Sequence, residues 1–478
     1  MDERILMLKI AGELGTKSAR TRRRFLRVLS ANARKALTRA GVPGEVEARW
    51  SRLFARTPDR PGAMEVLGRV FGLHSVSEVA VVPFGSLDEL VDRVAALNRD
   101  RVAGRTFAVR VKRSGTHPFR SPDVAVALGT ALLPGSAGVD LDDPAVEVRL
   151  EIVDDLAYVV LDAAPGAGGL PLGTGGKAVA LFSGGFDSPV ASWMAMRRGI
   201  ALELLVFDLG GCGQVDAALT VARDLVTRWS PGREPRAQVV DLAPVVAALR
   251  ARVASSIRQV VLKRAMYRAG TLAAEAVGAE ALITGESLGQ VSTQTLHNLA
   301  VAEESIGMPV LRPLIGMDKE EILRRARAIG THDASERVQE HCDIATGRVE
   351  TAARLRDVVG AEGALDESFL VSAIESRQTV DLTAWVPGPP PAHVVEVVPD
   401  GAVIVDVREP QEGGTVGHLR LPFSRVGDWA PGLDRSRTYV FVCTHGNRSE
   451  AVAHDLRRQG MDAFSLTGGT AGPGIRAA

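Results

Sequence analysis

The stretch AVALFSGGFDSPV, residues 178–190, decides the fold of the middle of the chain. Residues 178–182 are apolar, as in a buried strand, and Pro189 opens a helical pattern that runs to Arg198. The turn between them, S-G-G-F-D-S, lets the backbone approach a ligand, and the helix start points amide N–H groups at an anion. The stretch therefore predicts a phosphate site, although such a turn can also be purely structural. It lacks the Gly-Lys-Ser/Thr ending of a Walker loop, which implies different phosphate chemistry.

The same alternation continues beyond this stretch. The apolar runs ALELLVF, AQVVDL and ALITG follow, separated by longer helical patterns. This order predicts a doubly wound parallel sheet covered by helices. The Gly- and Pro-rich segment 162–177 precedes the sheet, and the Pro-rich segment 385–391 follows it as a spacer. Beyond the spacer, VVEVV and AVIVDVRE open a last small unit, so we expect a multidomain α/β protein.

Length and composition narrow the class of protein. At 478 residues the chain is too long for one core. No apolar run approaches the roughly 20 residues that cross a bilayer, and the start MDERILMLKI lacks the layout of a secretory signal. We therefore expect a cytoplasmic protein without a membrane partner. The cysteines are far apart and lack a C-x-x-C spacing, which argues against structural zinc and a disulfide-stapled fold, and no metal-ligand set is predicted. These cysteines are Cys212, Cys342 and Cys443.

The net charge of +0 hides a basic amino-terminal part. Residues 1–60 hold 15 Lys and Arg against 6 Asp and Glu, a difference of +9. Residues 21–40 fit an amphipathic helix with arginines on its other faces, which could simply be a solvated surface. Residues 105–113 fit a strand with a cationic outer face, carried by Arg110, Lys112 and Arg113. Two basic surfaces together favour binding to a nucleic-acid backbone.

The turn S-G-G-F-D-S resembles the pyrophosphatase loop of ATP pyrophosphatases, which activate a carbonyl oxygen as an adenylate. The stretches VLKRAMYR, ALITGESLGQVSTQT and LRPLIGMDKEEI are similar, in order and spacing, to parts of 4-thiouridine synthetases. The resemblance implies an ATP site, with Mg²⁺ near the catalytic Asp187. The residues implied in that site are Leu181, Phe182, Gly285 and Gln294 for adenine and ribose, Lys263 and Lys319 for phosphates, and Ser183, Gly184, Gly185 and Ser188 in the turn. Lys319 could instead be a solvated residue at a helix start.

A second candidate site surrounds Cys443, in C-T-H-G-N-R-S after the apolar run 439–442. The loop amides and the following helix start would stabilise an anionic sulfur, and Arg448 would add positive charge. The loop, with Gly446, Arg448 and Ser449, resembles the rhodanese active site, as do DVREP and GHLRLPF. Cys443 is therefore predicted to carry a persulfide, whereas a cysteine at an apolar strand end is more often buried and inert. Family members with this extension form a disulfide that would here join Cys342 to Cys443, while Cys212 matches no catalytic position.

The resemblance extends over nearly the whole chain and implies its domain plan. THUMP domains are associated with transfer RNA binding, which gives Arg110, Lys112 and Arg113 a proposed partner. The implied domains are ferredoxin-like (1–60), THUMP (61–163), ATP pyrophosphatase (174–375), a linker (376–394) and rhodanese-like (395–478).

The implied activity is that of a tRNA uracil 4-sulfurtransferase. A tRNA uridine, at position 8, would be adenylated at O4, and sulfur loaded onto Cys443 by a cysteine desulfurase would replace the oxygen. The resemblance also implies a homodimer and sulfur delivery to the ThiS carrier protein for thiamine synthesis. Three alternatives remain open: an enzyme that makes another thiolated base such as 2-thiouridine, one that amidates a metabolite, and a non-catalytic RNA-binding protein.

Overall fold

The computed structural model describes residues 3–49, 52–210, 213–338, 349–363, 367–388, 392–444 and 446–471. Cys212 and Cys342 lie outside these ranges. The chain divides into two compact units, of which the first comprises Met1–Gly176, Met196–Ala201 and Arg228–Glu234. The described strands form sheets of eight, six and five strands, so the expected multidomain α/β fold is confirmed. Within the described ranges, no helix is both long and apolar enough to cross a membrane.

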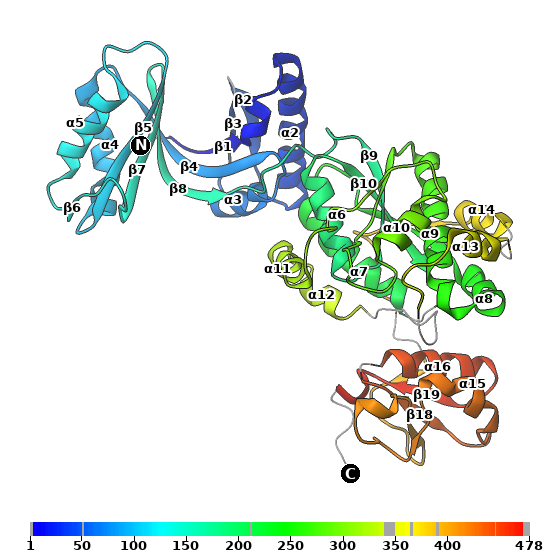
Figure 1. Cartoon of the computed structure of the whole chain (residues 1–478). Coiled ribbons are helices and arrows are strands. Elements are labelled where there is room, and N and C mark those ends of the chain that lie inside the picture. The colour runs from blue at the N-terminus through cyan, green and yellow to red at the C-terminus, as the bar shows by residue number, and fades with distance from the viewer. Residues whose placement is uncertain are drawn as a thin grey trace. The chain divides into compact units, whose positions relative to one another are not determined.

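The first unit is built on the eight-stranded sheet (Figure 1). Two apolar clusters join helices to this sheet, one with α2 and α3 and one with α4 and α5. The long strands β4 and β8 run through both halves, so the amino-terminal part and the part after it share one sheet. The strand order is β2 (Glu45–Arg49), β3 (Arg52–Arg56), β1 (Glu3–Ile10), β4 (Leu73–Pro83), β8 (Leu156–Pro165), β7 (Val146–Val153), β5 (Thr106–Ser114) and β6 (Gly138–Val139). The helices are α1 (Gly12–Gly15), α2 (Ala19–Arg39), α3 (Arg60–Gly68), α4 (Leu87–Val102) and α5 (Ser121–Leu132).

Helix α2 agrees with the amphipathic helix predicted for residues 21–40. The Ser18 side chain accepts a hydrogen bond from the N–H of Thr21 and so caps the first turn. Phe25, Leu29 and Leu37 are buried along one side of the helix. The arginines of the segment therefore lie on its remaining faces, as the spacing requires.

The six-stranded sheet forms the centre of the second unit. Strands β9 to β13 are parallel where their pairings are described, which confirms the predicted doubly wound sheet. Strand β14 runs antiparallel to β11 and lies inside the segment 376–394. A linker is expected there, but part of this segment pairs its backbone with a sheet edge. The order is β13 (Val310–Leu311), β12 (Ala281–Ile283), β9 (Lys177–Leu181), β10 (Ala201–Asp208), β11 (Arg236–Asp241) and β14 (Gln378–Asp381).

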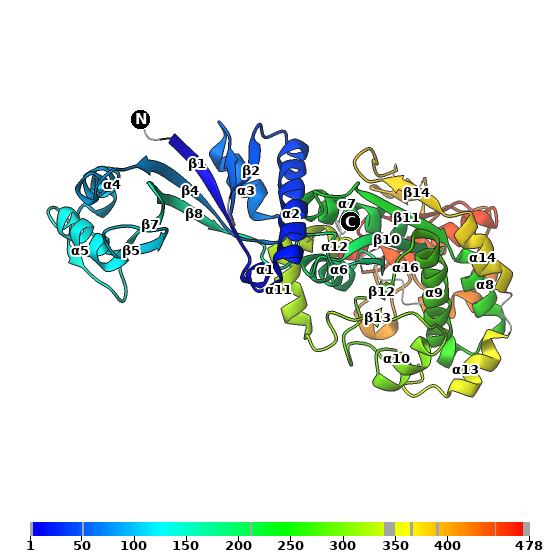
Figure 2. The ribbon, with the colours of Figure 1, turned by 90° about the horizontal axis from the view of Figure 1, so that it is seen from above.

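Helices cover both faces of this sheet, with α6 and α7 on one side and α9 on the other (Figure 2). Helix α9 packs against β9 and β12 and also contacts the helices α8, α10, α13 and α14. The carboxyl ends of the parallel strands remain the edge at which ligands of open α/β sheets bind. The helices are α6 (Asp187–Arg197), α7 (Gln214–Trp229), α8 (Ala243–Arg252), α9 (Ser255–Val277), α10 (Leu296–Glu303), α11 (Lys319–Ile329), α12 (His332–Glu336), α13 (Leu355–Glu362) and α14 (Glu367–Glu375).

The five-stranded sheet is parallel throughout its described pairings. Helix α16 (Asn447–Arg458) follows the third strand of the sheet, β18, and packs on β18 and β19. Cys443 comes directly after β18, at its carboxyl end. The order is β15 (Val394–Val395), β19 (Ala463–Leu466), β18 (Tyr439–Val442), β16 (Val403–Asp406) and β17 (Leu419–Arg420).

Candidate functional site

The glycine turn after β9 is closed by a hydroxyl at the start of α6. The Oγ atom of Ser188 accepts hydrogen bonds from the N–H groups of Ser183, at 3.2 Å, and Gly184, at 3.1 Å. Gly184 has a φ of +81°, and a Cβ atom there would lie 2.6 Å from the Cα of Ala218. The turn therefore requires glycine at this position and holds two backbone donors around one acceptor, as an anion site does.

The carboxyl end of β12 meets the same turn. A Cβ atom on Gly285 would lie 2.8 Å from both the carbonyl carbon of Asp187 and the nitrogen of Ser188, so the two backbones touch only because this residue is glycine. Gln294 returns to the same strand end, where its Oε1 accepts a hydrogen bond from Ser287 N–H at 3.3 Å. The structure thus brings Gly285 beside the turn. The side chain of Gln294 is held at the same strand end by its hydrogen bond to Ser287, two residues after Gly285.

The carboxylate of Asp187, the first residue of α6, has two side-chain partners. Lys319 Nζ lies 3.2 Å from Oδ1, and Gln290 Nε2 donates to Oδ2 at 2.9 Å. Lys319 also stacks its ammonium over the ring of Phe186, 5.4 Å from the centroid. The lysine is therefore oriented toward the turn, while its side chain stays 41% exposed to solvent.

Gln290 is absent from the residues expected at this site. Because a carboxylate only accepts, the nitrogen of this side chain must face Asp187 and its oxygen must face away. That oxygen, Oε1, is buried without a hydrogen-bond partner among the described residues. An acceptor of this kind suits a donor group of a ligand. The one sequence signal was its position inside ALITGESLGQVSTQT.

Lys263 belongs to a buried cluster of charged residues around Glu286, the residue that follows Gly285. Lys263 Nζ is 2.6 Å from Oε1 of Glu286, and Arg312 Nε is 2.7 Å from Oε2. The hydroxyls of Tyr267 and Thr284 donate to the same carboxylate. Lys263, expected to meet phosphate, thus already has an anionic partner. Sequence reasoning missed this cluster because the spacing of charged residues does not reveal long-range pairs.

The cluster shifts the ionisation of its members. Burial alone raises the pKa of Glu286, but the charges of Lys263 and Arg312 and the hydrogen bonds outweigh it and lower the pKa to about 2. Burial, with the neighbouring Glu286 charge, raises the pKa of Tyr267 far above its usual value. Tyr267 therefore stays a neutral donor to an ionised carboxylate, which fixes the charge pattern behind the turn.

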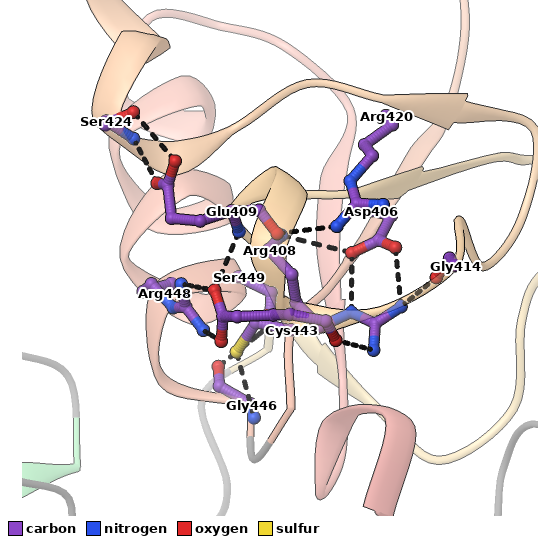
Figure 3. A network of polar contacts seen from close by, with 11 residues as sticks. Asp406, Arg408, Glu409, Gly414, Arg420, Ser424, Cys443, Gly446, Arg448 and Ser449 are labelled. Atoms are coloured by element: carbon purple, nitrogen blue, oxygen red, sulfur yellow. Dashed lines mark hydrogen bonds and ion pairs between the residues drawn. The ribbon is translucent and has the colours of Figure 1, made fainter.

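Cys443 lies inside a loop that is built around its sulfur (Figure 3). The thiol is 1% exposed, Gly446 N–H donates to Sγ at 3.2 Å, and Ser449 Oγ lies 3.6 Å from it. Thr470 N–H donates to the Cys443 carbonyl at 2.8 Å. A Cβ atom on Gly469 would approach that carbonyl oxygen to 2.0 Å, so a second loop can close over the cysteine only with glycine. The structure gathers Gly446 and Ser449 at the sulfur, as expected.

Arg448 has a different environment from the expected one. Its two terminal nitrogens each lie 2.6 Å from an oxygen of the Glu412 carboxylate, so its charge beside the sulfur is balanced (Figure 3). These hydrogen bonds lower the pKa of Glu412 to about 2. The expected disulfide from Cys443 to Cys342 cannot be placed, because Cys342 lies outside the described residues.

The basic strand β5 separates the three residues expected to bind RNA. Arg110 and Lys112 line a hollow of about 770 Å³ on the face of the sheet opposite α4 and α5. Arg113 belongs to the other face, where its guanidinium donates to the Gly115 carbonyl and contacts His117. Side chains alternate along a strand, so neighbouring residues cannot share a face. The hollow also has these polar or charged lining residues: Lys9, His74, Ser75, Ser77, Glu147, Arg149 and Glu151.

Comparisons with known proteins agree with this arrangement. The family model "Thiamine biosynthesis protein (ThiI)" matches residues 173–366, the THUMP model 84–162 and the ThiI ferredoxin-like model 5–77. A tRNA sulfurtransferase of Desulfurococcus amylolyticus is 38% identical over 474 residues, which cover 97% of each chain. The chain belongs to the tRNA sulfurtransferase family. The expected resemblance to 4-thiouridine synthetases is thereby confirmed.

Two further relatives of this sulfurtransferase chain support the assignment. The tRNA sulfurtransferase of Pyrobaculum aerophilum is 39% identical over 462 residues, covering 95% of each chain. A crystal structure of a 4-thiouridine synthetase in complex with RNA and with bound ATP superposes with a TM-score of 0.70 at 28% identity. That likeness covers 79% of this chain and 99% of the other.

The buried cluster generates a stability prediction for this tRNA sulfurtransferase family member. Glu286→Gln leaves the Lys263 charge without its carboxylate and removes one of the two carboxylates of Arg312, which keeps Glu303. We expect a loss of about 3–5 kcal/mol at neutral pH. Chemical denaturation, with hydrogen exchange of β9 and β12 as the local reporter, measures it. The exposed pair of Arg356 and Asp357 supplies the control, since Asp357→Asn should cost less than about 1 kcal/mol.

The pH dependence of this loss follows from the pKa of Glu286. The folded value, about 2, lies below the roughly 4.3 of an unfolded chain. The stabilisation is therefore complete above about pH 4.3 and fades as the pH falls toward 2. The wild type and Glu286→Gln should therefore approach the same free energy of unfolding as the pH falls toward 2. A difference that stays constant down to that pH would contradict the assigned ionisation of Glu286.

Proposed function

We propose that this chain uses ATP and a persulfide on Cys443 to convert a tRNA uridine, at position 8, into 4-thiouridine. The observation that carries the proposal is the turn at the start of α6, where two backbone donors, Asp187 and Lys319 converge. The relatives support it, because they are tRNA sulfurtransferases and a 4-thiouridine synthetase with RNA and ATP.

The first step is adenylation of the uridine at the glycine turn. The N–H groups of Ser183 and Gly184 would exchange the Ser188 hydroxyl for a phosphate oxygen of ATP, and the helix dipole favours its charge. Uridine O4 attacks the α-phosphorus, the O4–P bond forms, pyrophosphate leaves and the base loses its N3 proton. Lys319 lies where it can offset the charge that develops on the phosphates.

The remaining ATP contacts are assigned by position. Phe182 is buried behind the turn, while Leu181 lies at the end of β9, and both come from the strand that delivers the phosphate-binding backbone. Gly285 and Gln294 lie at the neighbouring strand end, β12. These residues would form the adenine and ribose pocket. Lys263 would act through Glu286, to which it is paired, and not as an isolated cation.

The carboxylate at this turn is a suitable ligand for Mg²⁺. The ion is usually held by one or two carboxylates together with substrate phosphates. Asp187 supplies such a carboxylate, since its side chain lies at the start of α6 beside the backbone donors. Bound there, Mg²⁺ would neutralise charge on the leaving pyrophosphate. Gln290 and Lys319 hold the carboxylate in place for this role.

The second step is sulfur transfer from Cys443. A cysteine desulfurase would load sulfur onto the thiol, and the donors Gly446 N–H and Ser449 Oγ would stabilise its anionic form. The outer sulfur attacks C4 of the adenylated base, and AMP leaves with the former O4. The Cys342 thiolate then attacks the Cys443 sulfur, so that the Cys342–Cys443 disulfide forms and the bond from Cys443 to the transferred sulfur breaks. That sulfur stays on C4 with the electron pair of the broken bond, and a cellular reductant reopens the disulfide.

The same loop would serve a second acceptor. Sulfur on Cys443 could pass to the carboxyl terminus of the ThiS carrier protein, and the family model described as a thiamine biosynthesis protein supports this route.

We further propose that the enzyme acts as a homodimer. The open face of the eight-stranded sheet, with Arg110 and Lys112, would bind the tRNA backbone.

The Asp187→Ala variant separates the two steps from the ATP side. It should still carry a persulfide on Cys443, but its tRNA-dependent release of pyrophosphate should fall by at least about 100-fold, because the carboxylate that supports the leaving group is gone. A pyrophosphate assay with and without tRNA measures this. Asp357→Ala, an exposed carboxylate in the same unit, should leave the rate unchanged. Undiminished release by Asp187→Ala would remove the turn from the mechanism.

The Cys443→Ala variant tests the sulfur-transfer step separately from adenylation. Thiolation should be abolished, while tRNA binding and pyrophosphate release remain, since Cys443 follows a strand of the five-stranded sheet and the glycine turn follows a strand of the six-stranded sheet. Mass spectrometry of the tRNA nucleosides distinguishes 4-thiouridine from 2-thiouridine as the lost product. Cys212→Ala should retain full thiolation. Normal thiolation by Cys443→Ala would refute the persulfide assignment.

The sidedness of β5 predicts which cations bind tRNA. Lys112→Ala should weaken binding and lower the slope of log affinity against log salt by about one unit, because one phosphate contact is lost. Arg113→Ala changes the same strand on its other face and should leave that slope unchanged. Filter binding across salt concentrations gives both values. Equal slopes for the two variants would place the RNA elsewhere.

A further inference from the structure

Ser465 is a polar residue on the inward face of β19. Ala463, two residues earlier, packs in an apolar cluster with Val452 and Leu456 of α16, and alternation along a strand gives Ser465 the same face. Ser465 is 1% exposed. A hydroxyl buried against apolar neighbours is costly unless it is hydrogen-bonded, so its partners indicate what it does there.

The hydroxyl of Ser465 meets that of Ser449, the serine of the sulfur loop. The two Oγ atoms are 2.9 Å apart, and Ser449 is fully buried. Ser449 Oγ also lies 2.8 Å from the carbonyl oxygen of Gly446 and 3.6 Å from Cys443 Sγ, and Figure 3 shows these three residues together. Ser465 Oγ is 3.4 Å from the same carbonyl. Ser465 therefore contacts the side chain that contacts the sulfur.

The number of hydrogens limits how this hydroxyl pair can be arranged, because each hydroxyl has one to donate. The hydrogen of Ser449 can point to the Gly446 carbonyl or to the sulfur. That carbonyl also accepts from Glu450 N–H at 2.9 Å, so Ser449 can turn to the sulfur without leaving a buried acceptor unpaired. The oxygen of Ser449 then accepts the hydrogen of Ser465, and both hydrogens point toward Cys443.

We propose that Ser465 is a positioning residue for the sulfur chemistry: its hydroxyl donates to Ser449, which donates to Cys443 whenever that sulfur carries the negative charge. This inference rests on the proposed role of Cys443 as the sulfur carrier. A hydrogen bond to an anion is stronger than one to a neutral acceptor, and a donor that itself accepts a hydrogen bond is strengthened further. The buried hydroxyl pair therefore favours the thiolate over the thiol.

The hydroxyl pair acts on the charging of Cys443 with sulfur. The Cys443 thiolate attacks the outer sulfur of a donor persulfide, a new S–S bond forms, and the donor cysteine leaves as a thiolate with the electron pair of the old bond. Cys443 Sγ is then the inner, uncharged sulfur of the new persulfide, and the Ser449 hydrogen can return to the Gly446 carbonyl. The pair should assist this charging step and leave adenylation at the glycine turn unaffected.

The test follows the ionisation of Cys443 in the full-length Ser465→Ala protein. The ultraviolet absorbance of the thiolate is measured against pH, and the signal of the matching protein with Cys443→Ala is subtracted. We expect the profile to move to higher pH by about half to one unit, which is roughly the three- to tenfold effect of one hydrogen bond. Thr467→Val removes a hydroxyl just after the same strand that bonds the Val395 carbonyl instead, and its profile should match the wild type.

Two further comparisons distinguish the hydroxyl pair from a loosened loop. Ser465→Thr keeps the hydroxyl and should restore the wild-type profile. In a Ser449→Ala background, Ser465→Ala should cause no additional displacement, because Ser465 acts through Ser449. Hydrogen exchange of β18 reports whether each variant is folded. Equal displacements with and without the Ser449 hydroxyl, or an unmoved profile in folded Ser465→Ala, would overturn the inference.

Sulfur loading by a cysteine desulfurase, measured by mass spectrometry, keeps two failures apart. Below the midpoint of the absorbance profile, Ser465→Ala should load about two- to fivefold more slowly, since less of its thiol is ionised. If the wild type takes up no sulfur while its profile still depends on Ser465, the persulfide role of Cys443 fails and the action of Ser465 on the thiolate stands. Normal loading together with an unmoved profile would refute the role of Ser465 alone.

Discussion

The two candidate sites depend on one constraint, that backbone N–H groups at the start of a helix need an acceptor. A parallel strand delivers such a helix at its carboxyl end, so the turn between them concentrates unpaired donors. After β9 the acceptor is the hydroxyl of Ser188, which a phosphate oxygen can replace. After β18 the acceptor is the sulfur of Cys443 itself. The same local geometry therefore suits an exchangeable ligand in one place and an attached sulfur anion in the other.

Around these turns, close backbone approach and fixed charge define the environment. Gly285 lets β12 touch the start of α6, and Gly469 lets a second loop reach the Cys443 carbonyl. Ion pairs then orient the side chains. Asp187 pairs with Lys319 at the first turn, and Glu412 pairs with Arg448 at the second. Each pair is formed by segments far apart in the sequence. The sites are thus pre-organised by contacts that a ligand does not have to create.

Local patterns predicted the middle sheet and both turns, because burial repeats with a fixed period along strands and helices and glycine marks close approach. They did not reveal β14, whose few residues are strand only through pairing with β11. They grouped Arg113 with Lys112, although alternation along β5 separates them. They also left the partners of Lys263 and Arg448 unknown, since a charged residue's type does not identify its long-range partner. Gln290 gave no signal beyond its motif.

The length of β4 and β8 has a consequence for how the amino-terminal unit can be divided. The ferredoxin-like match ends at residue 77, inside β4, and the THUMP match begins at residue 84, just after it. A chain cut just before residue 84 would strip β8 of its partner from Ser75 to Pro83 and leave a row of unsatisfied backbone groups. Such a fragment would tend to self-associate edge to edge. The two modules therefore share one sheet, which cannot be divided at this boundary without exposing a strand edge.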